Sequence, residues 1–206
     1  RVPACGAAAF RTLPTPCTPG RDLAVALKAT IFKVQLQISD LDRHYYQTLA
    51  PTIARHPSES DERMMVRLLA FAWFADPALS FTKGLCADDE PDLWQHSLSG
   101  EIERWIELGQ PDERRLRKAC GRAREVVVVN YGGRAADIWW QQNGDKLERL
   151  SNLAVMDIPA EQVRALAGLV ERSMDLQCTI DGGQAWVASE RASVEVTPAW
   201  RQRPGG

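Results

Sequence analysis

Long apolar runs are missing from the sequence. A helix that crosses a bilayer needs about 18 or more consecutive apolar residues, so we expect a soluble protein without a membrane span. Paired cysteines are missing too, because the 5 cysteines are scattered and form no CxxC motif. A disulfide framework or a zinc ribbon is therefore not indicated, and free thiols fit best in the reducing cytoplasm.

A strong charge imbalance and the common cofactor motifs are also absent. The formal net charge of −2 gives the molecule no overall attraction for nucleic acid or anionic membranes, so any basic surface must be local. There is no phosphate-binding glycine loop, HExxH motif or internal repeat, and the 3 histidines lack the spacing of metal ligands. A chain of 206 residues can bury one core, which favours a single domain.

Residues 1–24 lack a folding pattern. They include four prolines and three arginines, and they show neither the period of a strand nor that of a helix. Their apolar stretch is too short for a secretory signal. Patterned sequence begins at Val25, so we expect residues 25–206 to form the single domain. The preceding segment is a disordered arm, a processed segment or a translation of upstream codons, and in each case it should carry no fold.

The rest of the chain mixes strand and helix patterns. Polar and apolar residues alternate in 30–40, which predicts a half-buried strand, and 44–56 follow as its partner. The clearest helix lies in 56–76, where Ser58 or Ser60 can cap the first turn. Further helices are predicted in 110–124, 134–150 and 159–174, further strands in 101–108, 125–129 and 153–158, and hairpin strands in 176–198. This order predicts an α/β (α+β) protein with a mixed β-sheet flanked by helices.

Glu62 is the first candidate for a functional carboxylate. It lies three residues before Met65 and seven before Leu69, so it extends the inward face of the first predicted helix. One interpretation is an acid of the first turn that stabilises the helix dipole. The other is a binding site, because an inward carboxylate is costly unless it is paired or bound to a cation.

The stretch 100–129 predicts a sheet edge where a ligand could bind. Two strands joined by a helical crossover form a parallel pair, which brings their carboxyl ends together. Glu107 and Tyr131 are therefore expected to be neighbours at this edge. Asp92 belongs to the acidic stretch before Glu107, but it differs from its solvated neighbours because apolar sequence follows it.

Glu62, Asp92 and Glu107 lie in three predicted elements that could converge on this edge. Carboxylate ligands suit Mg²⁺ or Mn²⁺ better than zinc. Such a cation can lower the pKa of a bound water and neutralise charge on a phosphodiester, which is the chemistry of metal-dependent nucleases.

A row of basic residues lies on the helix that follows Glu107. Arg114, Lys118 and Arg122 are spaced four apart and share one helix face. They form either a solvated basic surface or a contact surface for the phosphates of nucleic acid.

Five segments carry a resemblance to a known family: "ALKATIFKVQLQISDLDRHYY", "ARHPSESDERMMVRLLAFA", "DDEPDLW", "GEIERWIELGQPDERRLRKACGRA" and "NYGGRAADIWW". In this order they resemble the YaeQ family of bacterial proteins, from Val25 onward. The resemblance implies a variant of the PD-(D/E)XK nuclease-like fold, with an αβββαβ core and extra β-hairpins. It also implies that Asp92 and Glu107 are the two motif acids and that Glu62 is the helix acid.

Gly109 departs from the nuclease pattern, which would place a lysine at this position to orient water and stabilise charge. Gln110 could orient a water instead, and Lys118 or Arg114 could supply charge. The leading hypothesis is a Mg²⁺-dependent (or Mn²⁺-dependent) nuclease-like protein, with Asp92, Glu107 and Glu62 as metal ligands or base. The alternative is a non-catalytic nucleic-acid-binding or regulatory protein that keeps the fold.

The resemblance also bears on the start of the folded chain. Sequences of this family typically open with Met followed by "ALKAT", and here Val25 takes the place of that Met. The codon GTG is read as methionine when it initiates and as valine inside a frame. Of the three interpretations of residues 1–24, we therefore favour upstream codons.

Overall fold

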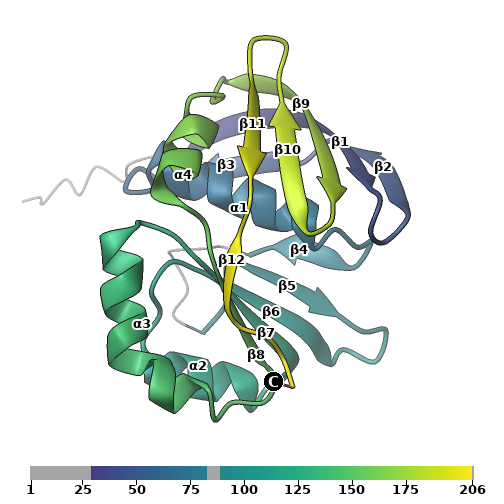
Figure 1. Cartoon of the computed structure of the whole chain (residues 1–206). Coiled ribbons are helices and arrows are strands. Elements are labelled where there is room, and N and C mark those ends of the chain that lie inside the picture. The colour runs from purple at the N-terminus through teal and green to yellow at the C-terminus, as the bar shows by residue number, and fades with distance from the viewer. Residues whose placement is uncertain (1–28, 83–88, 206) are drawn as a thin grey trace, which may run out of the picture.

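The computed structural model describes residues 29–82 and 89–205. Within these residues, the strands form two six-stranded sheets and four helices pack on them. Figure 1 shows the first sheet above and the second below, with α1 (Asp61–Trp73) between them. The predicted α+β class with mixed sheets is confirmed. Residues 1–24, which were predicted to carry no fold, lie outside the described residues.

The first sheet is built around β1 (Thr30–Asp40). Its order is β11-β10-β9-β1-β2, and β3 also pairs with β1. The bounds of its other strands are β2 Tyr45–Leu49, β3 Thr52–Arg55, β9 Ser173–Asp181, β10 Gln184–Ala188 and β11 Ser193–Val196. β1 pairs with β9 in parallel and with β2 and β3 antiparallel. As the alternation predicts, Phe32, Val34, Leu36 and Ile38 are buried and the residues between them are exposed.

The turn between β9 and β10 lies within the predicted hairpin region 176–198 and consists of two glycines. Gly182 and Gly183 have φ of +57° and +75°, which is the left-handed backbone that a two-residue hairpin turn needs. Their backbone N–H groups donate to the two carboxylate oxygens of Asp42, each at 2.8 Å. This contact fastens the turn to the loop that connects β1 and β2.

The second sheet has the order β12-β8-β7-β6-β5-β4. Its strands are β4 Leu79–Phe81, β5 Leu93–His96, β6 Ile102–Leu108, β7 Ala123–Asn130, β8 Leu153–Asp157 and β12 Ala199–Gln202. β6, β7 and β8 run parallel, as predicted for β6 and β7, while the outer strands are antiparallel to their neighbours. Val126 to Val129 of β7 are fully buried, because both faces of this sheet are covered.

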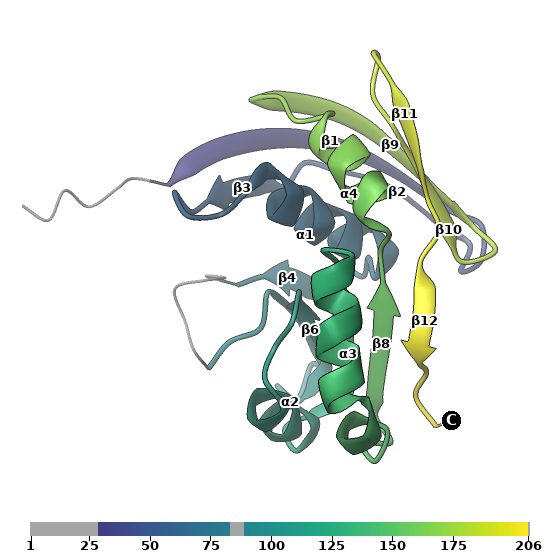
Figure 2. The ribbon, with the colours of Figure 1, turned by 60° about the vertical axis from the view of Figure 1, so that its left-hand side comes forward.

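The helices divide the interior into two cores. α1 and α4 (Ala160–Ala167) lie between the two sheets, and α2 (Glu113–Cys120) and α3 (Arg134–Leu147) cover the other face of the second sheet (Figure 2). Every residue of α1 from Met64 to Trp73 is buried. The sequence predicts a single buried stripe there, but a helix between two sheets has no solvent face.

The helix ends differ in detail from the prediction. The Ser60 hydroxyl caps α1 by accepting from Arg63 N at 3.1 Å. Asp112 caps α2 by accepting from Arg115 N at 2.8 Å, so the helix begins at Glu113, after the predicted start at residue 110. α4 ends at Ala167, well before the predicted end at residue 174. In the described part of the chain, no helix is long and apolar enough to cross a membrane.

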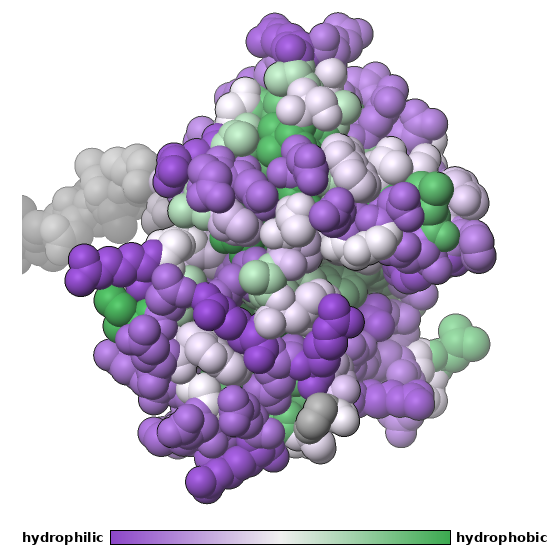
Figure 3. Space-filling view, viewed as in Figure 1, coloured by the Kyte–Doolittle hydropathy of each residue, from purple (hydrophilic) through white to green (hydrophobic). Residues whose placement is uncertain are grey.

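The face of the molecule that Figure 1 views has a largely hydrophilic surface. Figure 3 shows hydrophobic side chains there in small separate patches. Single exposed apolar residues are ordinary on proteins, so this face indicates no apolar docking surface.

Candidate active site

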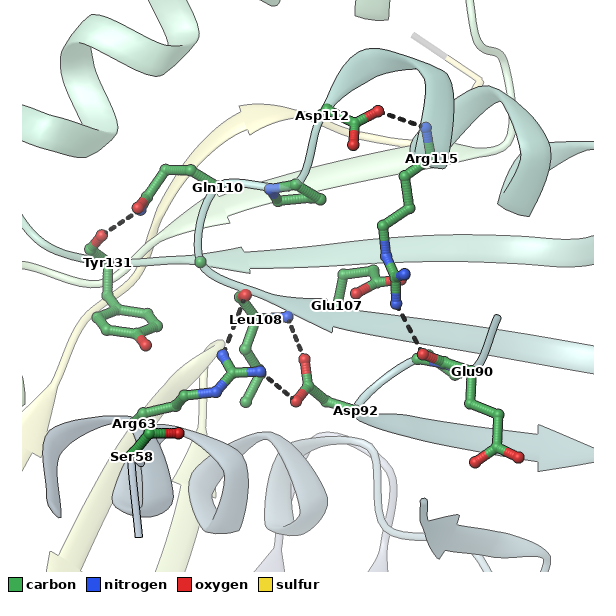
Figure 4. Close-up of a pocket in the computed structure, with 13 residues that line it drawn as sticks. Ser58, Arg63, Glu90, Asp92, Glu107, Leu108, Gln110, Asp112, Arg115 and Tyr131 are labelled. Atoms are coloured by element: carbon green, nitrogen blue, oxygen red, sulfur yellow. Dashed lines mark hydrogen bonds and ion pairs between the residues drawn. The ribbon is translucent and has the colours of Figure 1, made fainter. Parts of the chain in front are cut away.

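A pocket of about 620 Å³ opens at the carboxyl ends of β6 and β7, beside the first turns of α1 and α2 (Figure 4). Parallel pairing of β6 with β7 brings these two strand ends together, as Leu108 lies opposite Val129. The charged residues that line the pocket are Arg63, Glu90, Asp92, Glu107, Asp112 and Arg115. Tyr131 lines it too, so the predicted proximity of Glu107 and Tyr131 is confirmed.

Asp92 is buried at the entrance to β5, with 4% of its surface exposed. Its Oδ2 accepts a hydrogen bond from Leu108 N at 2.9 Å, and its Oδ1 pairs with the Arg63 guanidinium. Its own N–H donates to Ile106 O at 3.0 Å. Both carboxylate oxygens therefore have partners, and Asp92 ties the start of β5 to the end of β6.

Glu107 is equally buried, on the face of β6 that α2 covers. Its Oε1 accepts from Trp105 Nε1 at 2.8 Å and from Arg115 Nε at 2.7 Å. No described residue donates a hydrogen bond to Oε2. Burial raises the pKa of Glu107 above its ordinary value, and the bonds from Arg115 and Trp105 only partly oppose this. The site thus holds a carboxylate that burial disfavours, with one oxygen still available.

Two arginines bind these carboxylates from different helices. Arg63 reaches from α1, and its Nη1 also donates to Leu108 O at 3.2 Å. Arg115 reaches from α2, and its Nη2 donates to Glu90 O at 2.7 Å. Figure 4 shows the two guanidinium groups on either side of the pair of acids. Neither arginine could be predicted from the local sequence, because each contacts an acid on another element.

The Arg63 side belongs to a larger buried network. Glu59 precedes the cap of α1, pairs with Arg67 at 2.9 Å and lies 4.0 Å from Arg63. Burial raises the pKa of Glu59; the charges of Arg67 and Arg63 oppose this, and the charge of Asp92 adds to it. Glu59, Arg63 and Arg67 are spaced four apart, so the helical period could have identified them as one face.

Similarity to known proteins shows which family the chain belongs to. The family model of the YaeQ protein matches residues 25–198. The chain belongs to the YaeQ family. It is 48% identical to YaeQ of Escherichia coli (strain K12) and 46% identical to YaeQ of Salmonella typhi, and each alignment covers 86% of this chain and 99% of the relative.

Solved structures of YaeQ proteins share the fold. The crystal structure of YaeQ from Xanthomonas axonopodis pv. citri superimposes with a TM-score of 0.83 at 48% identity, over 85% of this chain and 99% of that one. YaeQ from Pseudomonas syringae superimposes with a TM-score of 0.82 at 35% identity, over 86% of this chain and 98% of that one. The two-sheet arrangement is therefore shared within the YaeQ family.

The structure brings two of the three predicted acids into the pocket of this YaeQ protein. Asp92 and Glu107 line it, whereas Glu62 is half-buried in the first turn of α1 and does not. Among the described residues, no group of three His, Cys, Asp or Glu side chains is arranged to hold a metal ion. The acid beside α1 whose charge interacts with Asp92 is Glu59, which precedes the helix. Glu59 is buried and is held there by its ion pair with Arg67.

The predicted helper residues divide in the same way. Gln110 lines the pocket, and its Nε2 donates to Asn130 Oδ1 and to Tyr131 O at the end of β7. Lys118 is exposed, pairs with Asp89 and does not line the pocket.

The rest of the basic row is not on one helix as predicted, because α2 ends at Cys120 and Arg122 follows it. Arg114 is exposed, and the Arg122 guanidinium lies 5.3 Å from the centroid of the Trp105 ring. Arg114, Lys118 and Arg122 therefore form an exposed basic surface beside the pocket, and none of the three lines it.

Gly109 has a backbone that other residues rarely adopt, with φ of +86°. A Cβ there would meet Tyr131 Cε1 at an ordinary 3.8 Å, so the obstacle to a lysine is the backbone and not space. We expect Gly109→Lys and Gly109→Ala to destabilise the fold equally, by about 1 to 2 kcal/mol. Urea unfolding of both variants measures this. A Gly109→Lys protein as stable as the parent would contradict the explanation.

Proposed function

We propose that the chain is a Mg²⁺- or Mn²⁺-dependent nuclease-like protein that acts on the phosphodiesters of nucleic acid. Its PD-(D/E)XK-like core would be α1-β4-β5-β6-α2-β7, with Asp92 and Glu107 as the motif acids. One observation carries this proposal: two carboxylates, each 4% exposed, line a single pocket at the carboxyl edge of parallel strands. Burying two such groups side by side is costly, and function is the usual reason for retaining them.

The donor set fits a hard divalent cation. Proteins commonly hold Mg²⁺ with one or two carboxylates, and water or substrate phosphate completes the coordination. Asp92 and Glu107 would supply the two carboxylates without Glu62. Glu107 Oε2 is the oxygen that no described residue occupies, whereas Asp92 would have to share its oxygens with Arg63 and Leu108 N. When bound, the cation would activate a water and neutralise charge on the phosphodiester.

The chain's own residues would orient the reactants. Gln110 is fixed through its Nε2, and its Oε1 accepts no hydrogen bond from a described residue, so it can accept one from a water. Arg63 and Arg115 line the pocket and Lys118 does not, so we assign the compensation of phosphate charge to the two arginines. The reducing cytoplasm, where nucleic acid is present, is the location that we propose.

An incubation series tests this function. The purified full chain is mixed with plasmid, linear and single-stranded DNA and with RNA, in Mg²⁺, in Mn²⁺ and in chelator. We expect cleavage of at least one substrate with metal and none with chelator. We also expect millimolar metal to raise the melting temperature, because a ligand that binds only the folded state stabilises it. The proposal would be contradicted if metal caused no cleavage of any substrate and did not raise the melting temperature.

The alternative function is nucleic-acid binding or regulation without cleavage. Two observations favour it: Gly109 stands where a nuclease carries lysine, and an arginine already neutralises each acid. The exposed row Arg114, Lys118 and Arg122 would then supply phosphate contacts without a cut.

Charge reversal tests this basic row. We expect Arg114→Glu combined with Lys118→Glu to weaken nucleic-acid binding and to reduce its salt dependence, because two phosphate contacts are lost. Fluorescence anisotropy at several salt concentrations measures both effects. The matched control is Arg164→Glu with Arg191→Glu, which changes the net charge equally at exposed sites on other elements. If both double variants changed nucleic-acid affinity and its salt dependence equally, the basic row would be an ordinary solvated surface and not a phosphate-binding one.

A further inference from the structure

A serine and a histidine meet in the turn that precedes α1. The His56 Nδ1 atom lies 2.6 Å from the Ser58 hydroxyl oxygen, and Ser58 N donates to the same nitrogen at 3.2 Å. A backbone N–H can only donate, so Nδ1 presents its lone pair to Ser58 and the imidazole carries its proton on Nε2. The Ser58 hydroxyl is therefore the donor in this contact, and His56 is placed to accept its proton.

The backbone of the turn holds this pair in place. Pro57 lies between the two residues and restricts the chain, and Glu59 N donates to His56 O at 2.8 Å across the turn. Glu59 is itself buried and paired with Arg67, which fixes the end of the turn to α1. Both members of the pair remain accessible, because His56 is half-buried and Ser58 is exposed.

Ser58 lines the same pocket as Arg63 and Tyr131. The Arg63 guanidinium donates to the Tyr131 hydroxyl, which leaves the phenolic proton available to another acceptor. Figure 4 shows Ser58 and the Tyr131 ring on the same side of the pocket, next to Arg63. A carbonyl group at Ser58 thus has a hydroxyl donor on its side of the pocket for the negative charge that develops on its oxygen during attack.

We propose that Ser58 is a nucleophile, activated by His56, that takes the acyl group from a small carboxylic ester in the pocket. Ser58 Oγ forms a bond to the acyl carbon while its proton moves to His56 Nδ1. The bond from that carbon to the alcohol oxygen breaks, and the leaving oxygen takes the proton from His56. Water then releases the acid by the same route, so the two steps need no other reactant. This activity goes beyond the proposed function and does not depend on it.

Covalent labelling tests the nucleophile. The full chain is incubated with a fluorophosphonate in chelator at about pH 8, where a free imidazole is neutral, and peptide mass spectrometry locates the labelled residue. We expect the label on Ser58, none in Ser58→Ala, and labelling about 100-fold slower in His56→Gln, because a positioned base contributes about this factor. The matched controls are Ser173→Ala and His96→Gln, at accessible residues of β9 and β5 that do not line the pocket. Both controls should be labelled like the parent.

Hydrolysis of p-nitrophenyl acetate in the same buffer provides the second measurement. Its rate should fall about 100-fold in Ser58→Ala and in His56→Gln and should be unchanged in the two controls. The proposal is overturned if the parent takes no label, if the label lies on another residue, or if His56→Gln reacts as fast as the parent. Because chelator is present throughout, each of these results leaves the metal-dependent function to its own test. Circular dichroism of each variant verifies that it is folded.

Discussion

Metal-dependent cleavage is expected to fall by at least about 100-fold in Glu107→Gln, because one of two carboxylates that would hold the cation loses its charge. The substitution keeps the size of the side chain and an oxygen for Trp105 Nε1, so the fold should remain. A time course of cleavage under Mn²⁺ measures the effect. The matched control is Glu103→Gln, since Glu103 lies in the same strand, pairs with Arg124 and does not line the pocket. If Glu107→Gln cut as fast as the parent, Glu107 would have no role in cleavage.

The stability of the same variant depends on pH in a defined direction. Burial raises the pKa of Glu107 above the ordinary value of 4.5, so its protonated form favours the folded state. This contribution is fully present below the ordinary pKa and is lost as the pH rises through the higher pKa of the folded state. Glutamine does not ionise. The free energy of unfolding of Glu107→Gln relative to the parent should therefore increase from acidic to neutral pH, which urea unfolding at several pH values can measure.

Asp92→Ala is expected to lower the free energy of unfolding by about 3 kcal/mol. The substitution leaves Arg63 without its closest carboxylate and the backbone N–H of Leu108 without its acceptor, and both groups lie in a mostly buried place. Urea unfolding at neutral pH measures the loss. Asp89→Ala is the control, because Asp89 is an exposed acid that pairs with exposed Lys118 and should contribute little. If Asp92→Ala were as stable as the parent, the contacts of Asp92 with Leu108 N and Arg63 would not contribute to stability.

Much of the architecture could be predicted because it depends on local periods. The alternation in β1, the apolar run of β7 and the Gly182–Gly183 turn each reflect one dominant requirement, and the structure has each of them. The arrangement of two sheets could not be predicted in this way. It depends on α1 being buried on every side, and a periodic stripe cannot show that a second sheet lies behind the helix. β12 was missed because its four residues are mostly exposed and carry no clear alternation.

The candidate site shows the same limit at the level of side chains. Asp92 and Glu107 could be named because the parallel crossover determines where their strand ends meet. Arg63 and Arg115 could not, because each contacts an acid on a distant element, across a distance that the local sequence does not encode.

Glu62 was predicted from its spacing to Met65 and Leu69, and it is only half-buried in the first turn of α1. The buried acid is Glu59, which precedes the helix and pairs with Arg67 of the same helix, a contact that the apolar spacing does not indicate.

The pairing of β1 with β9 has a consequence for the order in which the protein is made. Asp42, at the end of the first hairpin, meets the turn at Gly182, which lies 140 residues later in the chain. β1 therefore leaves the ribosome long before β9, its parallel partner, has been synthesised. Until then, the edge of β1 that pairs with β9 has no partner strand. Contacts of such long range slow folding, and exposed strand edges of this kind are sites of aggregation. The emerging chain should depend on a chaperone, or on temporary cover of β1, until its last quarter has been synthesised.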